Sequence, residues 1–70
     1  MTAVRAELMR LLAELGEEAN DLRIGQLIAN LATLARGANV EAIWDAEDEE
    51  LLEAAKRLVS HYRQRKAEVA

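Results

Sequence analysis

The acidic stretch in the second half of the chain is the first candidate for a chemical site, because clustered carboxylates can bind a cation. Its members are Asp45, Glu47, Asp48, Glu49, Glu50 and Glu53. The stretch lacks the glycine and the ligand spacing of a calcium-binding loop. Acidic side chains in the first turn of a helix are also favoured by the helix dipole. We therefore interpret the stretch as a solvated helix start and expect no metal site.

The residues needed for catalysis are sparse. His61 is the only histidine, and the chain has no cysteine. A zinc site would then need carboxylates or a second chain, and one histidine does not establish a Ser/His/Asp arrangement. No glycine-rich phosphate loop is present. The sequence predicts a protein without catalytic residues and without a cofactor, which is not an enzyme.

Polar side chains interrupt the apolar stretch LRIGQLIANL. Arg23, Gln26 and Asn30 lie at positions i, i+3 and i+7, so a helix would place them on one face. They could anchor the polar backbone of segment 38–48, for instance through a contact of Arg23 with Asp45 or Asp48. They could instead form a recognition surface. We favour the structural role, because buried amides are usually hydrogen-bonded to backbone.

The pattern R-I-G-Q-L-I-A-N followed by IWDAEDEELL resembles a loosely defined group of small bacterial and phage-type proteins. That group has the pattern R-x-G-Q-x-hydrophobic-x-N, followed by an element such as D-x-F-Y-x-E-D. Ile43, Trp44 and Asp45 stand where the group has its Phe-Tyr pair. The resemblance covers about Arg23 to Leu52. It implies one interlocked unit of glycine, amides and acidic element, and it implies no activity.

The stretch KRLVSHYRQRK holds the main concentration of basic residues, and these could contact phosphates. Against this, the formal net charge of the chain is −4. Basic residues at a helix C-terminus also complement the dipole, and Lys56 and Arg57 are within reach of Glu53. We therefore do not expect nucleic-acid binding and keep it as an alternative.

Proline is absent, and two of the three glycines follow apolar-periodic runs. With Gly16 and Gly37 as C-caps, the periodicity predicts helices over about 3–15, 22–36 and 46–66. The fold class is all-α: a three-helix bundle with a short connecting turn. We expect Thr2 to cap the first helix, Asn39 to cap a turn over 40–44, and Asp45 to cap the last helix. Trp44 should cover the end of the core.

The predicted helix 22–36 has two apolar faces. Ile24, Leu27, Ile28, Leu31 and Leu34 form a large one, whereas Gly25, Ala29 and Ala32 form a second face of small residues. Glycine inside a helix costs about 1 kcal/mol relative to alanine. Close approach by another helix, including one from a second subunit, would offset that cost.

The chain of 70 residues is expected to form a single domain, 1–70, in a size range where one core barely outweighs chain entropy. Without disulfides, self-association is the available extra source of stability, so we expect a homodimer. No apolar run is long enough to span a bilayer, and the charged N-terminal stretch does not resemble a signal peptide. We expect a cytoplasmic protein.

These observations favour a non-enzymatic protein-interaction or regulatory module. One alternative is a nucleic-acid-associated dimer that uses the basic end of the last helix. A second is an acidic inhibitor or immunity-type protein whose stretch DAEDEELLE binds a basic target.

Overall fold

The computed structural model of the chain describes the backbone of residues 2–69 and the side chains of residues 2–67. The regular secondary structure of these residues is entirely helical: α1 (Ala3–Glu18), α2 (Ile24–Arg36), the one-turn α3 (Ala42–Asp45) and α4 (Asp48–Val69). The all-α prediction is confirmed. Three helices match the predicted ones within about three residues at each end, and the predicted connecting turn is α3.

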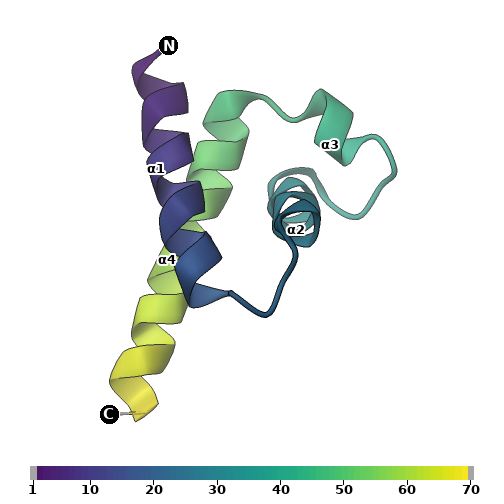
Figure 1. Cartoon of the computed structure of the whole chain (residues 1–70). Helices are drawn as coiled ribbons and strands as arrows, with labels where there is room; N and C mark the ends of the chain where they lie inside the picture. Colours follow the sequence, from purple (N-terminus) through teal and green to yellow (C-terminus); the bar gives the residue numbers. More distant parts are fainter. Residues whose placement is uncertain (1, 70) are drawn as a thin grey trace.

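Helices α1 and α4 lie side by side and run in the same direction (Figure 1). Three ion pairs join them along their length: Arg5 with Asp48, Glu14 with Arg63 and Glu18 with Lys66. From one pair to the next, the residue numbers rise in both helices, as they must when two helices run parallel. The chain must therefore return from the end of α1 to the start of α4, and α2 and α3 make this connection.

Helix α2 crosses the α1–α4 pair and is seen almost end-on in Figure 1. It packs on α4, while α3 packs on α2. The core between the three long helices is aliphatic and contains Leu8, Leu11, Leu15, Leu27, Leu31, Leu52, Ala54, Ala55 and Val59. Because α2 lies across the other two, one of its sides faces this core and another is left for α3.

The predicted helix ends are partly confirmed. The Thr2 hydroxyl accepts a hydrogen bond from the Arg5 backbone N–H at 3.1 Å, which caps α1 as expected. Gly37 ends α2 with a φ of 91°, a conformation that favours glycine. The prediction for Gly16 was wrong, since α1 continues to Glu18 and Ala19 is its C-cap. Leu15 and Ala19 are both buried, and their packing outweighs the low helix propensity of one glycine.

The start of α4 also differs from the prediction. Asp45 lies inside α3 and does not cap the long helix, which begins at Asp48. The Glu50 carboxylate instead accepts a hydrogen bond from the Glu47 backbone N–H at 3.0 Å, so a side chain in the first turn reaches back to the residue before the helix. The Asn39 side chain accepts a hydrogen bond from the Glu41 N–H at 3.1 Å and orders the approach to α3.

Candidate interaction surface

Large apolar side chains are exposed on and around α3. Val40 is 95% exposed, Trp44 90% and Ile43 56%. Trp44 was expected to cover the core, and this prediction was wrong. The α3 helix has four residues and packs through Ala42, which is 2% exposed. Successive helical residues are rotated by about 100°, so Ile43 and Trp44 turn away from the contact that Ala42 makes.

Ile24, in the first turn of α2, adds a further exposed apolar side chain and is 64% exposed. We define the α2–α3 surface by these four residues: Ile24, Val40, Ile43 and Trp44. Ile24 lies in α2, Ile43 and Trp44 lie in α3, and Val40 lies in the turn before α3. Helices α2 and α3 pack against each other (Figure 1). Trp44 also lines a shallow hollow with Thr2, Val4 and Arg5 at the start of α1. Exposed apolar residues that occur singly are ordinary, whereas several on neighbouring elements are typical of a binding surface.

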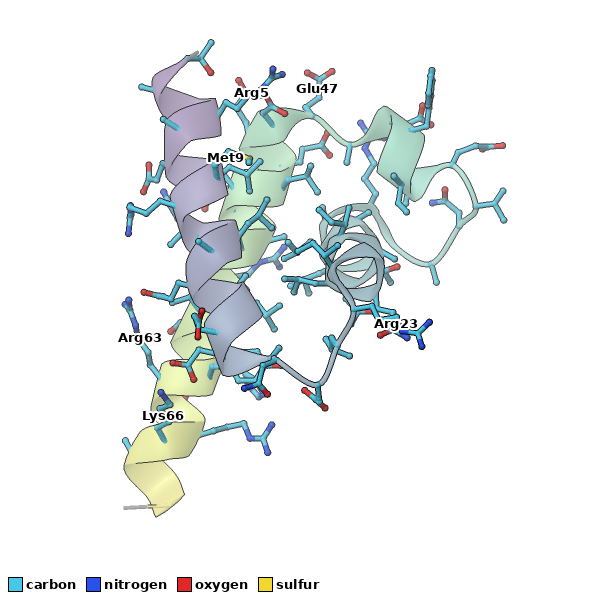
Figure 2. All side chains as sticks on the ribbon, in the orientation of Figure 1. Arg5, Met9, Arg23, Glu47, Arg63 and Lys66 are labelled. Atoms are coloured by element: carbon cyan, nitrogen blue, oxygen red, sulfur yellow. The ribbon has the colours of Figure 1, made fainter. Side chains whose placement is uncertain are left out.

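Charged side chains lie at both ends of the α2–α3 surface. Arg23 precedes Ile24 and projects away from α1 and α4 (Figure 2). Glu41 and Asp45 flank Val40 and Trp44 and are exposed. Among the described residues, none of these three side chains forms an ion pair. Arg23 and the exposed carboxylate of Asp21 thus lie at the start of α2, and two exposed carboxylates lie at α3.

The expected close contact at Gly25 is absent from the described chain. Gly25 is exposed, and a Cβ atom built on it would have no heavy atom within 4 Å. The small side of α2 is buried farther along, where Ala32 is 1% exposed. Helix α3 of the same chain packs on α2. The prediction that α2 is covered on two sides is thus met by a neighbour from its own chain, and Gly25 lies outside the contact.

The row of Arg23, Gln26 and Asn30 does not anchor segment 38–48. Gln26 accepts a hydrogen bond from the Arg23 backbone N–H at 2.8 Å and so caps the start of α2. Asn30 is exposed and makes no hydrogen bond to a described side chain or loop. Asn30 fails as an anchor because it lies on a side of α2 that adjoins α4.

Asn30 borders a shallow groove of about 310 Å³ between α2 and α4. The remaining lining residues are mostly apolar: Leu22, Thr33, Leu34, Leu58 and Tyr62.

The proposed contacts of Arg23 with Asp45 or Asp48 were wrong. Asp48 binds Arg5 of α1, with 2.9 Å between the Arg5 Nε and the carboxylate. Figure 2 shows Arg5 at the top of α1 beside the start of α4, far from Arg23. The parallel alignment of α1 and α4, which the periodicity of either helix leaves open, determines this partner.

Half of the acidic stretch is paired inside the fold, whereas Asp45, Glu47 and Glu49 form no ion pair between described residues. Asp48 pairs with Arg5, Glu50 with Arg36 at 3.0 Å, and Glu53 with Lys56. The hydrogen bond from the Glu47 N–H and the neighbouring Arg36 guanidinium hold the pKa of Glu50 below its ordinary value of 4.5. Within the described part of the chain, no group of three or more potential ligands is arranged to hold a metal ion.

Two basic side chains at the end of α4 form ion pairs with α1. Arg63 donates two hydrogen bonds of 3.0 Å to the Glu14 carboxylate, and Lys66 binds Glu18. Figure 2 shows both cations on the flank of α4 that adjoins α1. Arg57 donates to the Leu34 carbonyl at 3.4 Å, where it supports the end of α2. Arg65 alone among the cations of the last two turns has no ion-pair partner in residues 2–67.

Comparison with protein families, with curated proteins and with solved structures finds no match to this chain. Among the helices that the structure describes, none is long and apolar enough to cross a membrane.

Proposed function

We propose that the chain is a non-enzymatic, cytoplasmic protein-interaction module that binds its partner through the α2–α3 surface. The observation that carries this proposal is the exposure of Trp44 together with Val40 and Ile43 beside it. Tryptophan is enriched among the residues that dominate binding energy at interfaces. Full burial of an apolar side chain contributes about 1.5–3 kcal/mol, so these residues gain free energy only when a partner covers them.

The two alternative functions receive less support from the same geometry. A nucleic-acid-binding end on α4 would need free cations, and Arg63 and Lys66 are paired with Glu14 and Glu18. An acidic inhibitor would need free carboxylates at the start of α4. Asp48 and Glu50 are paired there with Arg5 and Arg36, which leaves Glu47 and Glu49 as the exposed carboxylates without an ion pair between described residues.

The proposal is tested with a photoreactive phenylalanine analogue placed at position 44 and expressed in the native cell. A matched protein carries the analogue at position 64, which is exposed on the polar end of α4. We expect covalent adducts on illumination from position 44 and none from position 64. Absence of adducts from position 44, or equal yields from both positions, would contradict the proposal.

A further inference from the structure

We infer that the hollow beside Trp44 binds a basic segment of the partner, with a lysine or arginine side chain of that segment on the indole ring. The inference rests on the proposed function, because Trp44 belongs to the α2–α3 surface. It adds the chemistry of the partner, and it can fail while the proposed function stands.

The hollow lies where the starts of α1 and α4 meet the end of α3, and its volume is about 390 Å³. Pockets that hold small ligands begin at about 300 Å³. Arg5 lines the hollow from α1, where its side chain binds Asp48 of α4 at 2.9 Å and so joins the two helix starts. Trp44 lines it from α3. We call this site the Trp44 hollow.

The Trp44 ring is the feature that points to a ligand. The side chain is 90% exposed, and among the described residues it has no aromatic neighbour, since the aromatic contact there joins His61 to Tyr62. Indole is the aromatic ring that binds cations best, when the cation lies within about 6 Å of the ring centre. Carboxylates at a helix start would not by themselves indicate a site, because the helix dipole favours them there.

The charge of the Trp44 hollow determines which ligand fits. One cation and four carboxylates line it, so its formal charge is −3. The cation, Arg5, is already paired with Asp48. The other three carboxylates are exposed and form no ion pair between described residues: Asp45, Glu47 and Glu49. Figure 2 shows Glu47 beside Arg5 at the end of the molecule where α1 and α4 begin.

The helix dipole does not account for all of these carboxylates. It favours acidic side chains near the start of a helix, whereas Asp45 is the last residue of α3. A bound cation would compensate Asp45 and the other unpaired carboxylates.

A basic segment fits both the ring and the charge. An ammonium or guanidinium group on the indole face is attracted by the ring, and carboxylates beside the ring attract the same group. An acidic segment would be repelled by them. An uncharged apolar segment could cover Trp44 but would desolvate the carboxylates without pairing them.

The test measures binding of the purified full chain to a fluorescein-labelled hexa-arginine peptide by fluorescence anisotropy. At about 150 mM salt the Debye length is about 8 Å, so carboxylates far from the bound peptide contribute little. The parent should bind hexa-arginine in a saturable manner and should not bind labelled hexa-glutamate.

Two double variants with the same net charge separate the Trp44 hollow from general acidity. Glu47→Gln with Glu49→Gln should raise the dissociation constant at least about twofold, the lower end expected when two exposed ion pairs are lost. Glu17→Gln with Asp21→Asn removes two exposed carboxylates that do not line the hollow, and this variant should bind like the parent.

The role of the ring is tested with Trp44→Leu, which keeps an apolar side chain but removes the indole. Its dissociation constant should rise about two- to fivefold. The matched control Met9→Ala changes an exposed apolar side chain of α1 outside the hollow and should bind like the parent. Circular dichroism checks that every variant remains helical.

Absence of hexa-arginine binding would overturn the inference, and so would equal affinities of the two double variants. In the cell, adducts from position 44 should map to a partner segment rich in lysine or arginine. Adducts that map to an uncharged or acidic segment would contradict the inference and leave the proposed function standing. Binding of hexa-arginine without any adduct in the cell would contradict the proposed function and leave the cation-binding hollow standing.

Discussion

Gly25 and Gly37 show that the surroundings and backbone conformation of a glycine determine its contribution to the free energy of unfolding. Its Cβ position is open, so Gly25→Ala in the dilute, monomeric range should raise the free energy of unfolding by up to about 1 kcal/mol. The measurement is urea denaturation followed by circular dichroism. Gly37→Ala is the matched control and should destabilise, because Gly37 has a φ of 91°. A destabilised Gly25→Ala protein would indicate a close contact that the single chain does not contain.

Glu50 links stability to pH. Its pKa is lowered in the folded state by the Glu47 N–H and by Arg36, so its ionised form stabilises the fold. This contribution is fully present above the ordinary value of 4.5 and is lost as the pH falls through the lowered pKa. Thermal unfolding of Glu50→Gln should therefore depend less on pH below 4.5 than that of the parent.

The matched control for this measurement is Glu49→Gln. Glu49 is exposed, adjoins Glu50 and has no ion-pair partner in residues 2–67. Its variant should keep the acid sensitivity of the parent, and equal effects of the two substitutions would refute the assignment to Glu50.

At the scale of the element, Gln26 and Asn30 belong to one polar row of α2, but only Gln26 caps the start of the helix. Gln26→Ala removes the acceptor of the Arg23 N–H and should lower the free energy of unfolding by about 0.3–1.5 kcal/mol. Asn30→Ala should leave the melting temperature nearly unchanged, because Asn30 is exposed. Scanning calorimetry of both variants checks the difference. A larger loss in Asn30→Ala than in Gln26→Ala would revive the anchoring role.

The contact between α1 and α4 depends on ion pairs at its far end. Arg63→Ala and Lys66→Ala should each reduce stability by about 0.2–1 kcal/mol at low salt, the usual range for exposed pairs. The effect should fade in about 1 M salt, where screening is strong. Arg65→Ala removes the same charge from the same helix without breaking an ion pair between described residues, so it should change little. Equal losses at positions 63 and 65 would mean that net charge, not pairing, is responsible.

For the whole molecule, the pairing of the basic end predicts weak or absent binding to duplex DNA at 150 mM salt, and only marginal binding at about 50 mM. The net charge of −4 acts in the same direction. Fluorescence anisotropy with a labelled duplex measures this. Submicromolar affinity at 150 mM that disappears when Arg63, Arg65 and Lys66 are changed to alanine would favour the nucleic-acid alternative.

The sequence by itself determined the helices and two of their ends. Apolar residues repeat at helical spacing, and the signals at Thr2 and Gly37 act within one turn, so no distant contact is needed to read them. The same local reasoning failed at Gly16, where burial of Leu15 and Ala19 carries α1 onward. The expectation that Asp45 caps the last helix was also wrong, because Asp45 is the last residue of α3.

Only the tertiary structure decided which side chains meet and which remain exposed. Helical periodicity indicates that two helices pack, but it does not indicate whether they run parallel. Because α1 and α4 run parallel, Asp48 pairs with Arg5 and not with Arg23. The sequence did not reveal the exposure of Trp44 either, because it depends on α3 being short and burying Ala42. The candidate site therefore includes Trp44, which the local pattern assigned to the end of the core.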